Sequence, residues 1–111
     1  MNAEEKVSLI TAILTKHKAA DIVTLDVHHL TSLLHYLIIC TGTSTRHIRA
    51  LANHLARFST TIDEKTKSHD DPETGWMLID LGDCVVHLMT EEMRTFYALE
   101  KLWHVEDSLT E

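Results

Sequence analysis

Glycine and proline are scarce in this chain of 111 residues, which contains three glycines and one proline, Pro72. The turn Thr41-Gly42-Thr43-Ser44 precedes a predicted helix, where free backbone N–H groups could hold a phosphate. It has neither the lysine of a P-loop nor the spaced glycines of a dinucleotide-binding loop. We therefore expect Thr43 or Ser44 to act only as the helix cap.

Cysteine and long apolar runs are also scarce. The two cysteines, Cys40 and Cys84, lie in apolar segments predicted to be strands, which is typical of buried, reduced thiols in a cytoplasmic protein. No apolar run is long enough to span a bilayer. We expect no signal peptide ahead of the first helix, which begins with Glu and Lys.

Basic residues are outnumbered, because ten Lys and Arg face seventeen Asp and Glu, and the formal net charge is −7. This balance argues against a broad basic surface that binds a phosphate backbone. It is compatible with a basic protein partner, since complementary charge would increase the association rate.

The N-terminal half alternates helical and strand patterns. A helix is predicted from Ala3 to about Ala19, with Asn2 as a possible cap. A β-branched strand follows at Ile22–Val27, and His28–Leu34 is a polar connector. The apolar run Tyr36–Cys40 indicates a central strand that is covered on both faces.

The Gly42 turn then leads to a helix from about Thr45 to Phe58. Strand, short turn and helix form a β-α unit, which predicts some parallel pairing. Its predicted buried stripe consists of Ile48, Leu51, Ala52, Leu55 and Phe58. The polar segment Thr60–Gly75 is predicted to be a mobile loop with one short edge strand near Lys65–Ser68.

The densest apolar and aromatic stretch runs from Trp76 to Trp103. Its first part, to Met89, reads as two short strands joined at Leu81-Gly82-Asp83, which is a hairpin signal. From Glu91 to Trp103 the spacing is helical, with Thr90 as cap and Met93 and Phe96 on the inward stripe. A small α/β domain follows from these patterns, with the acidic segment 104–111 as a frayed tail.

Known catalytic patterns are missing. Asp80 and Asp83 flank a turn, where Asp favours local hydrogen bonds, so they do not form the carboxylate pair that a nucleotidyltransferase uses to hold divalent ions. Nine histidines raise the question of a metal. The adjacent pair His28-His29, and His47 with His54, match no closed zinc site, so surface histidines plus a strand histidine at His87 are preferred. We expect no cofactor and no metal.

Three large apolar residues could belong either to the core or to a binding interface. Trp76 follows a polar loop, Leu81 lies at a turn where full burial is hard, and Tyr97 is off the Met93 stripe. Arg94 and Tyr97 share one helix face. Because Trp, Tyr and Arg are enriched at binding hot spots, the interface and core interpretations are about even.

The ordered motifs nevertheless resemble one family. They are Leu25-Asp26-Val27, Leu30-Thr31-Ser32, Ile38 to Ser44 with Arg46-His47, Asp80 to Asp83, Val85-Val86-His87, Glu92-Met93-Arg94, Phe96-Tyr97, Leu99-Glu100 and Leu102-Trp103. This set resembles the ribosomal silencing factor (RsfS, Iojap-like) family. Two places depart from its pattern: His35 stands where an Asp is usual, and the loop 68–75 lacks the usual Glu-Gly pair.

The resemblance implies a single domain over residues 1–103, with an α/β/α fold that is nucleotidyltransferase-like but lacks the active site. It implies a cytoplasmic protein that is not an enzyme. Such proteins bind large-subunit ribosomal protein fourteen (uL-fourteen), block joining of the ribosomal subunits and so repress translation when nutrients are scarce. It also allows a homodimer. The implied contact residues are Trp76, Leu81, Asp83, Arg94 and Tyr97. A nucleotide-binding or nucleotidyltransferase-like protein and a large-subunit assembly factor are the alternatives.

Overall fold

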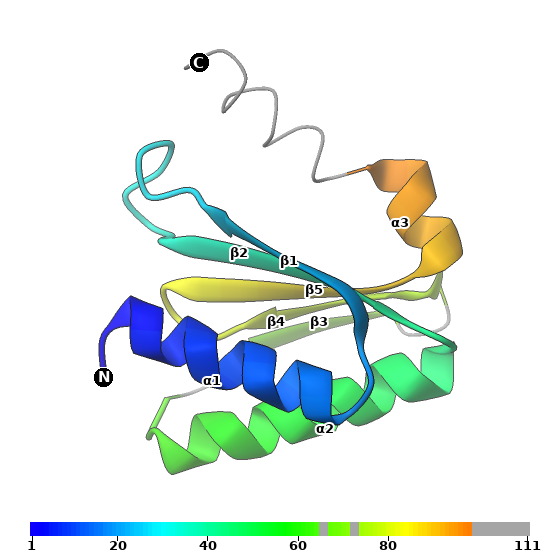
Figure 1. Cartoon of the computed structure of the whole chain (residues 1–111), viewed down its shortest axis with the longest axis horizontal. Helices are drawn as coiled ribbons and strands as arrows, with labels where there is room; N and C mark the ends of the chain where they lie inside the picture. Colours follow the sequence, from blue (N-terminus) through cyan, green and yellow to red (C-terminus); the bar gives the residue numbers. More distant parts are fainter. Residues whose placement is uncertain (65–66, 72–73, 99–111) are drawn as a thin grey trace.

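Five strands form one mixed sheet in the computed structural model, which describes residues 1–64, 67–71 and 74–98 (Figure 1). The strands are β1 (Ala20–Asp26), β2 (Tyr36–Gly42), β3 (Lys67–Asp71), β4 (Trp76–Asp80) and β5 (Cys84–Thr90). Their order in the sheet is β1-β2-β5-β4-β3. The β2–β5 pair is parallel and the other pairs are antiparallel, which confirms the predicted parallel element. The edge strand expected near Lys65–Ser68 is β3.

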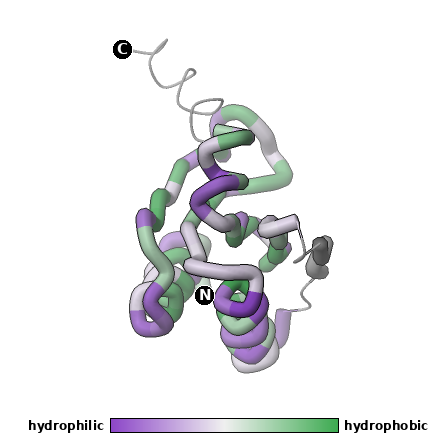
Figure 2. Tube along the Cα trace, turned by 90° about the vertical axis from the view of Figure 1, so that its right-hand side faces the viewer, coloured by the Kyte–Doolittle hydropathy of each residue, from purple (hydrophilic) through white to green (hydrophobic). Residues whose placement is uncertain are grey.

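Helices α1 (Ala3–Lys16) and α2 (Thr45–Thr61) cover one face of the sheet, and the short α3 (Glu91–Tyr97) lies at one end of the other face. Figure 2 looks along the two long helices and shows both below the sheet, with α3 above it. The predicted small mixed sheet with helices on its faces is therefore confirmed. No helix in the described part of the chain combines the length and apolar character needed to cross a bilayer.

Side-chain alternation divides the core into two apolar clusters, one on each face of the sheet. The larger cluster joins the sheet to α1 and α2 through side chains that include Ile10, Leu14, Ile38, Ile48, Leu51, Leu55, Val86 and Leu88. The smaller one contains Val27, Leu37, Ile39 and Met89. Strand β2 contributes to both, so it is covered on both faces as predicted.

Both cysteines lie on the larger cluster's side of the sheet and are fully buried. Desolvation by this burial raises the pKa of the Cys40 and Cys84 thiols to about 12 in each case. At neutral pH both are therefore protonated, and a protonated thiol is a poor nucleophile and metal ligand.

Side-chain caps begin each of the three helices in the described part of the chain. Asn2 Oδ1 accepts the Glu5 N–H at 2.8 Å, and Ser44 Oγ accepts the His47 N–H at 3.0 Å. Thr90 Oγ1 accepts the Met93 N–H at 3.4 Å. Each cap satisfies a backbone donor that the helix itself leaves unpaired, so the sequence identified these helix starts correctly.

The ends of α1 and α3 differ from the prediction. Helix α1 stops at Lys16, three residues early, because Lys18 adopts a left-handed conformation with φ +67°. Helix α3 stops at Tyr97 because Ala98 is left-handed, with φ +47°. The remainder of the predicted helix to Trp103 and the tail 104–111 lie outside the described residues.

The hairpin turn between β4 and β5 depends on Gly82. Its φ is +86°, and its N–H donates to Asp80 Oδ1 at 2.9 Å. A Cβ atom added at Gly82 would lie 2.2 Å from Glu64 Oε1. The turn thus needs glycine both for its left-handed backbone and for the close approach of the Glu64 side chain.

Gly82→Ala should lower the free energy of unfolding by about 1.5 kcal/mol, because the left-handed backbone alone costs an L-residue about 1–2 kcal/mol. Urea denaturation of both proteins measures this difference. The clash with Glu64 should make the substitution less costly in a Glu64→Ala background. Strictly additive costs would show that Glu64 does not restrict this position.

Candidate functional site

Three aromatic rings meet at the end of the sheet where α3 begins. Trp76 opens β4 on the face turned away from α1 and α2, and its ring centroid lies 4.5 Å from that of Tyr97. The Phe96 and Tyr97 ring centroids are 5.0 Å apart. Phe96 is 77% exposed and Tyr97 is 46% exposed. We call Trp76, Phe96 and Tyr97 the aromatic cluster.

The sequence-based prediction placed Phe96 on the inward stripe of the last helix, and this prediction is wrong. The helix ends one residue later, at Tyr97, and none of its side chains is fully buried. Of the α3 side chains, only Met93 packs against the smaller apolar cluster. Phe96 therefore projects from the surface and joins the two aromatic residues that the sequence did identify.

His87 fixes the orientation of Trp76. The Trp76 indole Nε1–H donates to His87 Nδ1 at 3.0 Å, and the His87 side chain is buried. Burial lowers the pKa of His87 to about 4, so the ring is neutral at pH 7 and Nδ1 is free to accept this bond. The hydrogen bond to buried His87 fixes one edge of the indole, while the Trp76 side chain as a whole is only half-buried.

The pKa of His87 has a consequence for stability. A histidine in the unfolded chain has a pKa of about 6.5, well above the value of about 4 in the folded protein. The unfolded state therefore binds a proton first as pH falls below 6.5, and the contribution of neutral His87 to stability is lost progressively towards pH 4. Above pH 6.5 it is fully present.

His87→Gln should remove about 1 kcal/mol of the decrease in unfolding free energy between pH 7 and pH 5.5. Glutamine does not titrate, and its amide oxygen can still accept the Trp76 N–H. Urea denaturation of both proteins at the two pH values measures the effect. The same pH dependence in both proteins would mean that His87 titrates normally.

Arg94 is tied to the sheet. Its guanidinium donates to Thr41 Oγ1 at 2.9 Å and to the Asp21 carbonyl oxygen. These bonds join α3 to the β1–β2 edge of the sheet and hold the helix that carries Tyr97. Arg94 thus lies on the same helix as two members of the aromatic cluster, with its side chain in internal contacts.

Leu81 and Asp83 lie at the opposite end of β4 and β5. The six steps along β5 from Cys84 to Thr90 separate the two ends by about 20 Å. Leu81 is 0% exposed and belongs to the larger apolar cluster, so the expectation of an exposed anchor there is wrong. Leu81 continues the side-chain alternation of β4, since Met77 and Ile79 belong to the same cluster, and it therefore points towards α1 and α2.

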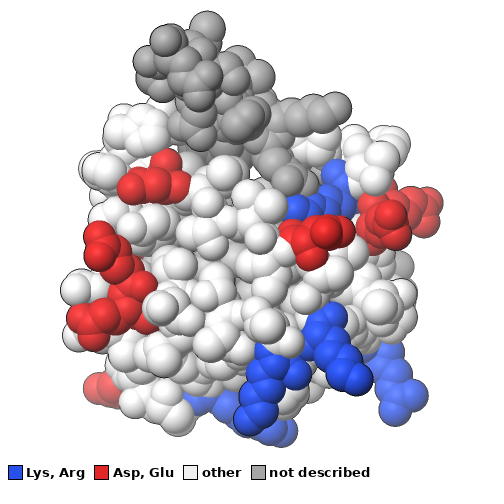
Figure 3. Space-filling view, viewed as in Figure 1, with Lys and Arg blue, Asp and Glu red and all other residues white. Residues whose placement is uncertain are grey.

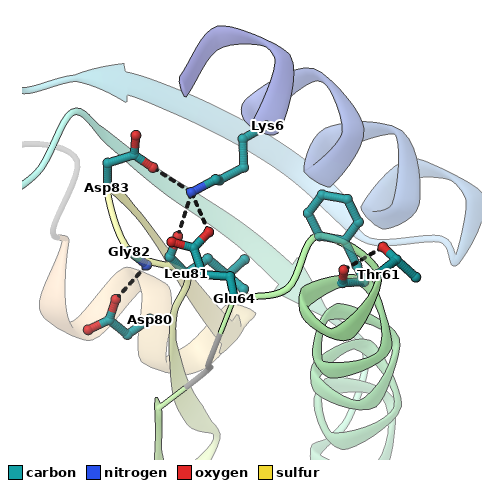
Figure 4. A network of polar contacts seen from close by, with 8 residues as sticks. Lys6, Thr61, Glu64, Asp80, Leu81, Gly82 and Asp83 are labelled. Carbon is teal, nitrogen blue, oxygen red and sulfur yellow. Dashed lines mark hydrogen bonds and ion pairs between the residues drawn. The ribbon is translucent and has the colours of Figure 1, made fainter. Parts of the chain in front are cut away.

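Asp83 takes part in a network around the buried Lys6 (Figure 4). Lys6 Nζ lies 2.8 Å from Asp83 Oδ1 and 2.6 Å from Glu64 Oε2, and it donates to the Leu81 carbonyl at 3.0 Å. Burial alone would lower the pKa of Lys6, but the two carboxylates outweigh it and raise that pKa. Burial would raise the pKa of Asp83, but Lys6 lowers it. Both groups are therefore charged at pH 7, and they join α1, the end of α2 and the hairpin turn.

Two backbone N–H groups of the Gly42 turn that could bind a phosphate are already hydrogen-bonded within the protein. The Thr43 N–H donates to His47 Nδ1 at 2.9 Å, and the His47 N–H is capped by Ser44. A Cβ at Gly42 would lie 2.9 Å from Ile48 Cγ1, so glycine here allows close packing of the helix on the strand. The capping interpretation of this turn is confirmed.

Charge is distributed unevenly over the surface. In the view of Figure 3, acidic side chains lie along the left margin, and others lie at the upper right. Basic side chains gather at the lower right, near the start of α2, where Arg46 and Arg49 are exposed.

Sequence reasoning missed two contributors to this site, Phe96 and His87. Phe96 was assigned to a longer helix. For His87, the hairpin register offered a signal: the turn at Leu81-Gly82-Asp83 pairs Leu78 with His87, and this makes Trp76 a diagonal neighbour on the same face.

Comparisons with known proteins agree with this fold. The family model described as "Ribosomal silencing factor during starvation" matches residues 1–111. The chain is 40% identical over 92 residues to the ribosomal silencing factor RsfS of Haemophilus influenzae, covering 78% of this chain and 85% of that protein. It is 31% identical to the mouse protein called mitochondrial assembly of ribosomal large subunit protein 1, covering 93% of this chain and 47% of the mouse protein.

A solved structure has the same fold as this chain. The crystal structure of a Chromobacterium violaceum protein superposes with a TM-score of 0.88 at 35% identity, covering 94% of this chain and 88% of that chain. The related proteins carry the names of ribosome-associated regulators and not of enzymes. On the family match and these similarities together, the chain belongs to the ribosomal silencing factor family.

Proposed function

We propose that this chain binds the large ribosomal subunit through ribosomal protein fourteen (uL-fourteen) and prevents the small subunit from joining by occupying space. Translation would then fall when nutrients are scarce. Family membership supports the large subunit as partner, and the names of the relatives support a repressive role. The proposed location is the cytoplasm, where such a factor would meet ribosomes.

The observation that carries this proposal is the exposed aromatic cluster. Tyrosine and tryptophan are enriched among the few residues that dominate binding energy at interfaces. Here the indole is oriented by His87 and the neighbouring helix is tied down by Arg94. A surface that is ordered before binding loses less conformational entropy when a partner docks on it.

We propose Trp76, Tyr97 and Phe96 as the apolar anchors, with Phe96 replacing the buried Leu81. Arg94 is proposed to support them by holding α3 in place. Asp83 can contribute only to an interface that extends over the full length of the sheet, because it lies at the far end. A net charge of −7 would favour a basic ribosomal protein as the partner.

The test is co-sedimentation of the purified protein with isolated large and small ribosomal subunits, combined with a subunit-joining assay. We expect binding to large subunits alone and suppressed joining. Cross-linking to a large-subunit protein other than ribosomal protein fourteen would contradict the proposed partner. Absence of binding to either subunit would contradict the function.

Assembly of the large subunit is the second candidate, favoured by the name of the mouse relative. An assembly factor would sediment with immature large subunits in preference to mature ones. A joining inhibitor would bind mature large subunits in vitro. The two functions are therefore distinguished by which particles the protein accompanies in a gradient.

A homodimer formed through the aromatic cluster is a further alternative for the same surface. In that case Tyr97→Ala would change the mass measured by light scattering and leave ribosome binding intact. The proposed function predicts the reverse result, a loss of ribosome binding with no change of mass.

A further inference from the structure

Three potential metal ligands converge where β1 ends and β2 begins. Asp26 is the last residue of β1, His28 follows two positions later, and His35 directly precedes β2. One ligand atom from each side chain lies within 4.8 Å of the other two. Among the described residues, these three are the His, Cys, Asp or Glu side chains that lie close enough together to share one ion.

The backbone fixes the positions of these residues. Val27, between Asp26 and His28, is 1% exposed and anchors the turn in the smaller apolar cluster. The Val27 N–H donates to the His35 carbonyl at 2.9 Å, and the His35 N–H donates to the Asp83 carbonyl at 2.8 Å. The turn that follows β1 keeps Asp26 and His28 together, because the His28 N–H donates to Asp26 Oδ1 at 3.3 Å.

The Asp26 carboxylate lies beside both imidazoles. Its Oδ1 contacts His28 Nδ1, and its Oδ2 is 4.0 Å from His35 Nε2. The two histidine ring centroids are 4.7 Å apart, and the His35 ring stacks on Tyr36 with centroids 4.3 Å apart. Stacking on Tyr36 restricts the orientation of the His35 ring.

Contrary to the expectation from the sequence, we propose that Asp26, His28 and His35 form a binding site for a divalent first-row transition metal ion, with Zn²⁺ as the best match. Imidazole nitrogens select ions of this class, whereas Mg²⁺ and Ca²⁺ prefer oxygen ligands. Two histidines and one carboxylate supply three ligands and leave a fourth, open position.

The geometry is close to what such an ion needs. In a tetrahedral zinc site with ligand bonds of about 2.0–2.2 Å, ligand atoms are roughly 3.3 Å apart. The widest spacing here is within 4.8 Å, so no pair has to close by more than about 1.5 Å. Small side-chain rotations achieve this at exposed Asp26 and His28, where no packed core opposes them.

A bound ion would connect both ends of the β1–β2 connection and close the segment 29–34 into a loop. This segment presents Leu33, which is 86% exposed. The ion site lies near the Asp83 end of the sheet, about 20 Å along β5 from the aromatic cluster. Metal binding is therefore a property separate from the proposed ribosome binding, and either can fail without the other.

The test is titration of the metal-free protein with Zn²⁺ in competition with a chromophoric chelator. We expect one ion per chain, and we expect His28→Asn and His35→Asn each to weaken binding by about tenfold or more, since even indirect partners of a metal contribute that much. At a hundredfold excess over Kd, Zn²⁺ should raise the Tm by roughly 5 °C or more. Mg²⁺ should not.

His54→Asn is the matched control, because His54 stacks on His17 at a centroid distance of 3.5 Å elsewhere on the surface. It should bind Zn²⁺ like the original protein. Circular dichroism without metal shows whether each variant is folded. The proposal is overturned by absence of saturable binding, by unchanged affinity in folded His28→Asn and His35→Asn, or by loss of binding in His54→Asn.

Discussion

Trp76→Ala should weaken binding to the large ribosomal subunit by about 30-fold or more, which corresponds to at least about 2 kcal/mol. We expect Trp76 to contribute most to binding, because its ring contacts Tyr97 directly and is oriented by a hydrogen bond to His87. Removing the indole takes away the largest aromatic surface of the cluster and the packing partner of Tyr97. Co-sedimentation with large subunits at increasing protein concentration measures the affinity.

Trp76 also packs against the smaller apolar cluster, so its removal affects stability as well as binding. Phe96→Ala separates the two effects, because a side chain that is 77% exposed contributes little to the core. We expect this variant to bind more weakly at unchanged Tm. Leu33→Ala is the control, since Leu33 is exposed at the other end of the sheet. Full binding by a folded Trp76→Ala protein would place the contact surface elsewhere.

Lys6→Met should lower the free energy of unfolding by about 3 kcal/mol. The substitution keeps most of the aliphatic volume but removes the ammonium that bonds to Glu64, Asp83 and the Leu81 carbonyl. Two carboxylates then face each other with no cation between them. The expected cost is at the low end for a broken buried ion pair, because the Glu64 and Asp83 side chains are 31% and 45% exposed and keep some water.

Lys16→Met is the matched control for this experiment. It makes the same change on the same helix at an exposed position, so the unfolding free energy should stay within about 0.5 kcal/mol of the original value. Urea denaturation at pH 7 measures both variants. Equal stability of the Lys6 and Lys16 variants would mean that the buried ion pairs make no net contribution.

Local patterns in the sequence were sufficient for most of the fold. Asn2, Ser44 and Thr90 cap helices because short polar side chains satisfy neighbouring backbone donors, and such signals require no knowledge of distant contacts. The run Tyr36–Cys40 predicted a strand buried on both faces, and the Gly82 turn predicted the hairpin. The family resemblance supplied Trp76 and Tyr97, which the structure brings together.

Other features of the structure were not evident from local patterns. The burial of Lys6 depends on Glu64 and Asp83, which are 58 and 77 positions away in the sequence. Leu81 seemed too close to a turn for burial, yet it continues the inward alternation of Met77 and Ile79 and packs under α1 and α2. His35 is separated from His28 by a connector, so ligand spacing along the chain gave no indication that the two rings meet.

The parallel pairing of β2 with β5 determines when this protein can fold. The pairing joins Tyr36 to Cys84 and Gly42 to Thr90, so each contact closes a loop of about 48 residues, and closing such a loop costs entropy before any contact is gained. A chain synthesised from its N-terminus cannot complete the centre of its sheet until its last strand has emerged. Tyr97 follows that strand in the chain, so its contact with Trp76, and with it the proposed ribosome-binding surface, cannot form before the last strand has been synthesised.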